Sequence, residues 1–72
     1  MMDLEKAKAT LKDRLDEYEG RIKRNPENYK QWIDQMYGFM LGIENAVDGL
    51  YEWVNENDIW TEWYMRNHPA YK

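Results

Sequence analysis

Cysteine and serine are absent from this 72-residue sequence, and histidine occurs only once, as His68. Without cysteine no disulfide can hold the chain together, and one imidazole cannot supply the four nitrogen or sulfur ligands of a structural zinc site. A core of this size rarely yields more than about 3–5 kcal/mol of stability. We therefore predict no metal site, and we expect self-association or a partner to supply what the core lacks.

The side chains that act in enzyme catalysis are also scarce. Thr10 and Thr61 carry the only aliphatic hydroxyl groups, and neither has a histidine at helical spacing to act as its base. His68 precedes a proline near the end of the sequence, where an exposed ring is the common outcome. The Glu-x-x-His pairs of helical di-metal sites are missing, and the acids near residues 55–58 lack the spacing of a calcium loop. We predict that the chain is not an enzyme and has no catalytic residue and no cofactor.

Long hydrophobic runs are missing too. An unbroken apolar run such as 39–41 lasts only three residues, far short of the roughly 20 that a membrane span needs. The first residues lack the basic and then apolar regions of a secretory signal. We expect a cytoplasmic protein that does not contact membranes.

Positive charge is sparse in the second half of the sequence. The net charge is −4, yet residues 1–24 sum to +1 and residues 25–72 to −5. Between Glu44 and Glu62 there are six acidic residues and no basic one. Such a segment repels phosphate backbones and anionic lipids. We therefore predict no direct binding of nucleic acid and a partner protein that is itself basic.

The spacing of apolar residues predicts helices throughout. Over residues 3–24, steps of three and four keep one narrow apolar face, formed by Leu4, Ala7, Leu11, Leu15, Tyr18 and Ile22. Asn25 can cap a following helix, and Pro26 is tolerated as its first residue. The tight connection favours an antiparallel neighbour.

Residues 26–55 carry the strongest helical pattern in the chain. Alternating steps of three and four form a heptad seam of Ile33, Met36, Met40, Ile43, Val47, Leu50 and Val54. Further apolar residues widen the arc on both sides of the seam, with Trp32, Phe39, Ala46 and Trp53 on one flank and Tyr37 and Tyr51 on the other. An arc this wide is typical of a helix that faces two neighbours.

The seam loses its phase after residue 55. Asn57 or Asp58 can cap a new helix, so we predict a break followed by a short helix over 59–67 and a tail over 68–72. If the break is absent, a helix of about 40 residues spans roughly 60 Å. The predicted fold is all-α, an antiparallel helical hairpin with a short third C-terminal helix, within one domain of residues 1–72.

The wide arc has two interpretations. It is either the core of a monomeric three-helix bundle or the interface of a dimeric helical bundle, and we favour the dimer because residues 3–24 offer few large aliphatic side chains to cover it. The predicted oligomer interface consists of Trp32, Ile33, Met36, Phe39, Met40, Ile43, Val47, Leu50 and Trp53.

Gly38 and Gly42 lie four residues apart inside this predicted helix, and each costs about 1 kcal/mol relative to alanine. Either they allow another backbone to approach closely, or they make room for bulky side chains of the same chain.

Two groups of residues are candidates for binding a partner. The first is a ridge of acids at four-residue spacing, Glu44, Asp48, Glu52 and Glu56, which is either a docking rim or a solvated face. The second is the aromatic arc of the short helix, Trp60, Trp63 and Tyr64, whose members are either anchors in a partner or contacts within the chain.

These observations favour a small acidic protein-binding module, an inhibitor or an adaptor, that acts as a homodimer. Three alternatives stay open: a mimic of DNA that inhibits a nucleic-acid-binding protein, an oligomer that sequesters a small ligand or nucleotide in aromatic pockets, and a purely structural oligomer.

One fragment resembles a known family. The segment 25–28 together with Trp32 is similar to the junction that opens a tetratricopeptide repeat, which implies a helix–turn–helix unit. Met36 and Asp48 stand where that family has small residues, and the chain contains no second copy. In composition the chain is similar to the short, acidic, aromatic-rich proteins of phages and mobile elements.

Overall fold

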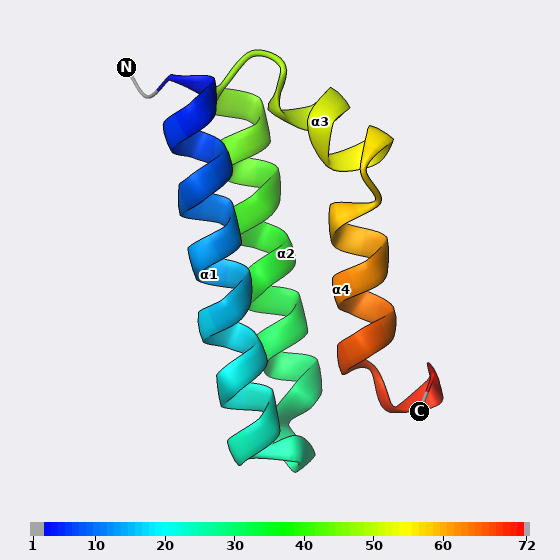
Figure 1. Cartoon of the computed structure of the whole chain (residues 1–72). Coiled ribbons are helices and arrows are strands. Elements are labelled where there is room, and N and C mark those ends of the chain that lie inside the picture. The colour runs from blue at the N-terminus through cyan, green and yellow to red at the C-terminus, as the bar shows by residue number, and fades with distance from the viewer. Residues whose placement is uncertain (1–2, 72) are drawn as a thin grey trace.

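The computed structural model describes residues 3–71, and all regular structure in that range is helical. The four α-helices are α1 (Leu4–Arg24), α2 (Tyr29–Ala46), α3 (Leu50–Glu56) and α4 (Ile59–Asn67), and 3-10 turns span Pro26–Asn28 and Pro69–Tyr71. The predicted all-α class is confirmed. Figure 1 shows α1 and α2 side by side and running in opposite directions, with α4 descending beside them.

Local chemistry explains both ends of α1. The Asp3 carboxylate accepts a hydrogen bond from the Lys6 backbone N–H at 2.8 Å, which satisfies one free donor of the first turn. Arg21, Lys23 and Arg24 lie in the last turn, where positive charge stabilises the negative end of the helix. Asn25 and the 3-10 turn that follows reverse the chain into α2.

The prediction of one helix over residues 26–55 is wrong at residues 47–49. Val47 is extended, and Gly49 has a φ of +89°, a left-handed conformation that side chains with a Cβ rarely adopt. This break separates α2 from α3. The Asp48–Gly49 pair is a common turn signal, and the continuous heptad pattern concealed it because Val47 and Leu50 are buried on both sides of the turn.

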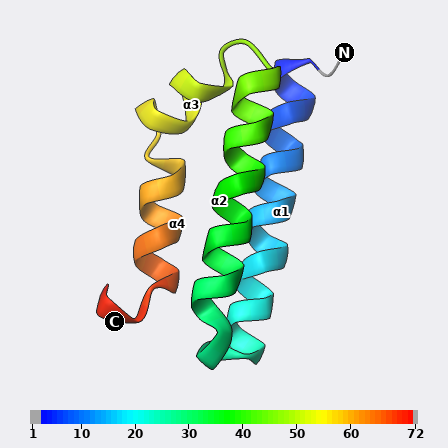
Figure 2. The ribbon, with the colours of Figure 1, turned by 180° about the vertical axis from the view of Figure 1, so that it is seen from behind.

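A second bend separates α3 from α4. Asp58 has a φ of +51°, and the Asn57 side chain donates a hydrogen bond to the Trp53 carbonyl at 2.9 Å. The bend lets the chain run back along the α1–α2 pair, as Figure 2 shows from behind. The two short helices α3 and α4 therefore lie opposite one face of α2.

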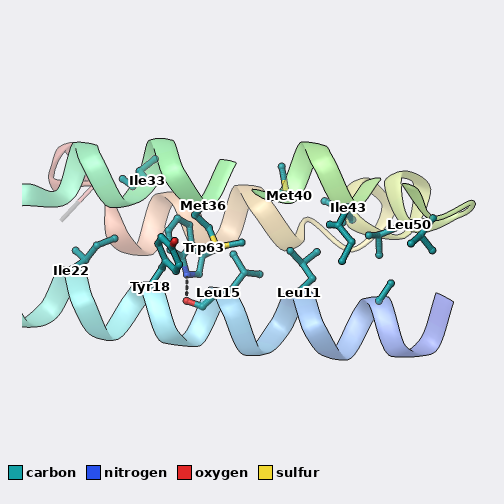
Figure 3. Packing of buried hydrophobic residues seen from close by; sticks show 13 residues of the cluster. Leu11, Leu15, Tyr18, Ile22, Ile33, Met36, Met40, Ile43, Leu50 and Trp63 are labelled. Atoms are coloured by element: carbon teal, nitrogen blue, oxygen red, sulfur yellow. Dashed lines mark hydrogen bonds between the residues drawn. The ribbon is translucent and has the colours of Figure 1, made fainter. Parts of the chain in front are cut away.

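Trp63 of α4 closes the core. Its side chain is 1% exposed, and its indole N–H donates to the Leu15 carbonyl of α1 at 2.9 Å. Figure 3 shows this bond and the surrounding side chains of α1 and α2, among them Met36. Near the end of α4, Arg66 forms a bidentate pair with Glu19, at 2.7 and 3.1 Å. One long-range hydrogen bond and one ion pair thus attach α4 to α1.

Basic side chains of α1 cover the aromatic flank of α2. The Arg21 guanidinium lies over the Trp32 ring at 5.1 Å, and the Arg14 guanidinium over the Phe39 ring at 4.5 Å. The same arrangement extends to α3, where the ammonium groups of Lys8 and Lys12 lie 5.2 and 5.5 Å from the Trp53 ring. Long basic side chains cover apolar surface with their stems and bind aromatic faces with their charge. The spacing of apolar residues does not reveal this use of the basic side chains.

The expectation that one chain cannot cover the heptad seam is therefore wrong. Among the residues predicted for an oligomer interface, six lie buried in the chain's own core: Ile33, Met36, Met40, Ile43, Val47 and Leu50. Trp32, Phe39 and Trp53 are half-buried and pack against that core. The six seam residues are buried within one chain, whereas Trp32, Phe39 and Trp53 keep part of their surface exposed, and dimerisation stays a prediction.

Candidate functional site

A groove of about 220 Å³ lies between α2 and the wall formed by α3 and α4. Its lining residues come from three helices: Tyr37, Met40, Leu41 and Glu44 from α2, Tyr51, Val54 and Asn55 from α3, and Trp60 and Thr61 from α4. Met40 and Val54 are core residues, so the groove opens directly above the core.

Helical spacing and the two bends build this groove. Tyr37, Leu41 and Glu44 follow one another by four and three residues, which places them on one face of α2. The break at residues 47–49 turns α3 away from the axis of α2, and Tyr51 then stands across from that face. The bend at Asp58 brings Trp60 back, with its ring centre 5.3 Å from that of Tyr37.

The groove carries much of the exposed apolar surface of the chain. The exposed fraction of the side chain is 45% for Tyr37, 40% for Leu41 and 59% for Tyr51. Trp60 is half-buried and stacks on Trp63, with ring centres 5.1 Å apart. Rigid aromatic side chains that remain in contact with water and rest on a packed core are typical of binding surfaces.

Glu44 is the acidic residue of the groove. Its side chain is half-buried, and burial raises the pKa of its carboxyl above the ordinary value. Across residues 3–71, no basic side chain forms an ion pair with it. The groove therefore combines aromatic surface with a carboxylate whose charge the described chain does not neutralise.

Two other hollows have a different electrostatic character. One contains Lys12 and Arg66 beside acidic residues. The other contains Lys30 beside Asp34, together with His68. In both, positive and negative charges of the chain are mixed, whereas the lining of the groove at Glu44 includes no basic residue.

The predicted acidic ridge is divided among three segments. Glu44 lies on α2, Asp48 in the turn at residues 47–49, and Glu52 and Glu56 on α3. The turn at Gly49 breaks the four-residue spacing, so a continuous ridge on one helix is not formed. Asp48, Glu52 and Glu56 are exposed, and of the four acids only Glu44 lines the groove.

The three predicted aromatic anchors lie next to one another, with Trp60 between Trp63 and Tyr64, but they differ in burial and in their other contacts. Trp60 lines the groove. Trp63 is a core residue that is 1% exposed, so it presents almost no surface to a partner in this structure. Tyr64 is half-buried and packs against the rings of His68 and Tyr71, with centres 5.1 and 6.1 Å away, outside the groove. The bulk of Trp63 fills the space between α4 and the α1–α2 pair, which spacing alone did not reveal.

The apolar spacing of the sequence did not identify Leu41, Tyr37 and Tyr51 as residues that line one groove. It predicted the two tyrosines on one flank of a continuous helix. The signal that identifies them is the Asp48–Gly49 pair, because a turn at that position moves Tyr51 from the line of Tyr37 to the opposite wall.

The comparisons with known proteins add no resemblance: no family model, no curated protein and no solved structure matches the chain. Within residues 3–71, no helix has both the length and the apolar character that crossing a membrane demands. In the same range, no three His, Asp or Glu side chains gather closely enough to hold a metal ion.

Proposed function

We propose that this chain is a protein-binding module whose recognition surface is the groove between α2 and α3–α4. The observation that carries the proposal is the set of exposed aromatic and apolar side chains, Tyr37, Leu41 and Tyr51, around the half-buried Trp60. Tyrosine and tryptophan dominate the energetics of interfaces because they bury large area with few rotatable bonds.

The partner that suits this surface is an apolar segment of a protein with basic character. Glu44 lies in the groove, and Glu52 and Glu56 stand on α3 with no base between residues 44 and 62 to offset them. The negative electrostatic potential of these acids speeds the approach of a basic partner and repels an acidic one. Whether the chain acts as an inhibitor or as an adaptor depends on what the bound segment does elsewhere.

Dimerisation belongs to the proposal in a revised form. The seam of α2 is buried within the chain, so we propose that a second copy binds the exposed residues of the groove instead. Sedimentation of the purified chain against concentration tests this directly. A dimer that the Tyr51→Ala variant abolishes would make the groove a self-association site.

The experiment that tests the proposed function is selection of peptides from a random library displayed on phage, with the purified full chain as the target. We expect enriched peptides to bind the wild-type chain and to lose about tenfold or more in affinity with the Tyr51→Ala variant, because truncating an interface anchor costs more than 1 kcal/mol.

Tyr71→Ala is the matched control. Tyr71 is 56% exposed, close to the 59% of Tyr51, and lies outside the groove. We expect the enriched peptides to bind this variant as they bind the wild type. No enrichment over a blank target, or equal loss with both variants, would remove the groove from the function.

A further inference from the structure

We propose that the groove holds an arginine side chain of the partner, with the guanidinium group against the rings of Tyr37 and Trp60 and paired with the Glu44 carboxylate. This inference rests on the proposed function and specifies the chemistry that the groove recognises. It follows from the charge of the lining residues and from a related arrangement elsewhere in the same chain.

The chain already contains a guanidinium held by aromatic rings and a carboxylate. Arg21 lies 4.9 Å from the Tyr18 ring and 5.1 Å from the Trp32 ring, and its guanidinium pairs with Glu17 at 2.7 Å. An aromatic pair and one carboxylate therefore form a suitable environment for a guanidinium on this scaffold.

The groove presents the same aromatic and acidic groups without a base of its own. The Tyr37 and Trp60 rings lie 5.3 Å apart at 48°, and Tyr51 stands on the opposite wall. Glu44 supplies the carboxylate, and none of the lining residues is basic. A cation from outside the chain is the group that complements this set.

Burial of Glu44 strengthens the argument. Desolvation raises the pKa of its carboxyl, which means that the ionised form is poorly solvated where it stands. A bound cation would restore the lost electrostatic stabilisation, and the ordinary acidity of the carboxyl with it. A neutral or acidic side chain would not.

Arginine fits better than lysine because of its shape. The planar guanidinium stacks on aromatic faces and presents parallel N–H donors to a carboxylate, and it is less strongly hydrated than an ammonium group. The groove offers both an aromatic wall and a carboxylate, so it uses both properties at once.

The test compares three tripeptides: acetyl-Leu-Arg-Leu-amide, its counterpart with citrulline, which keeps the shape of arginine but is neutral, and its counterpart with lysine. The leucines supply contacts for the apolar walls. Binding to the full chain is followed by NMR through the Trp60 indole N–H. We expect the arginine peptide to bind about tenfold more tightly than the citrulline peptide, and the lysine peptide to fall between them.

Two variants separate a local pair from general negative charge. Glu44→Gln should remove the preference for arginine. Glu52→Gln removes one carboxylate of α3 outside the groove lining and should leave that preference within about twofold. Equal binding of the arginine and citrulline peptides, or a preference that survives Glu44→Gln, would overturn the inference.

The outcome for this inference is distinct from that for the proposed function. Enriched peptides that lack arginine and still depend on Tyr51 would leave the proposed function standing and remove the arginine subsite. Enriched peptides that bind with no dependence on Tyr51 and no dependence on Glu44 would remove both.

Discussion

At the scale of single residues, Trp63 and Trp32 each have a buried indole N–H, and the two differ in whether that N–H has a hydrogen-bond acceptor. Trp63 donates to the Leu15 carbonyl and fills the space beneath α4. Trp32 lies under the Arg21 guanidinium, and its buried N–H meets no acceptor among the described residues. A buried donor with a partner stabilises the fold, whereas one without a partner costs free energy.

We therefore expect the same substitution to cost different amounts of stability at the two positions. Trp63→Phe should lower the free energy of unfolding by about 2 kcal/mol, because it removes a buried hydrogen bond and leaves a small cavity. Trp32→Phe should cost less than about 1 kcal/mol, since the unpaired N–H is lost with the ring. Urea denaturation of both variants measures the difference. Equal losses would contradict the assignment of Trp63 as the attachment of α4.

Two carboxyl groups should respond to pH in opposite directions. The hydrogen bond from Arg66 lowers the pKa of Glu19, so its contribution to stability is present above the unfolded pKa of about 4.3 and is lost as pH falls through the folded value. Burial raises the pKa of Glu44, so its charged form destabilises the fold at neutral pH and protonation relieves this.

Glu19→Gln should therefore lower the melting temperature at pH 7, and the difference from the wild type should shrink on acidification to about pH 3. Glu44→Gln should raise the melting temperature at pH 7 or leave it unchanged, while weakening arginine binding. Thermal unfolding monitored by circular dichroism at both pH values tests the pair. A Glu44→Gln variant less stable than the wild type at pH 7 would show that the carboxylate serves the fold rather than binding.

At the scale of elements, apolar spacing predicted where helices form but not where the long one breaks. The residues at steps of three and four in α1 are the residues that the structure buries, from Ala7 to Ile22. The heptad pattern over 26–55 continued through the turn because the buried side chains before and after Gly49 happen to keep the same spacing. A left-handed glycine is a backbone property, and side-chain periodicity does not report it.

Three glycines, Gly38, Gly42 and Gly49, have different surroundings, and alanine substitutions distinguish them. A Cβ added at Gly38 or Gly42 would meet nothing within 4 Å, so neither glycine makes room for a side chain of the same chain. At Gly49 the φ of +89° opposes substitution, whereas the Leu4 side chain, 3.4 Å from an added Cβ, would only be in van der Waals contact with it.

We expect Gly38→Ala and Gly42→Ala each to raise the free energy of unfolding by about 0.5–1 kcal/mol, because alanine is the better helix former. Gly49→Ala should lower it by about 1–2 kcal/mol because of the left-handed backbone. Urea denaturation of the three variants provides the measurement. If Gly49→Ala stabilised the chain, the turn at residues 47–49 would be contradicted and one continuous helix over 26–55 would be supported.

At the scale of the whole molecule, the described chain buries its heptad seam and leaves exposed aromatic side chains around the groove between α2 and α3–α4. The aromatic flank that suggested a second chain is covered by Arg14, Arg21 and the lysines of α1. Composition indicated a protein rich in interface residues, but it could not say which of them the fold would use. Which aromatic residues are buried and which stay exposed depends on two features of the backbone: the turn at Gly49 and the bend that brings α4 back beside the α1–α2 pair.

The measurement that tests the central claim most directly is a map of backbone amide shifts in the labelled full chain on adding a peptide enriched by the display selection. The account predicts that the largest changes cluster at Tyr37, Leu41, Glu44, Tyr51 and Trp60 around the groove. Changes that gather instead around Tyr29, Tyr64 and His68, or that spread evenly over the chain, would contradict it.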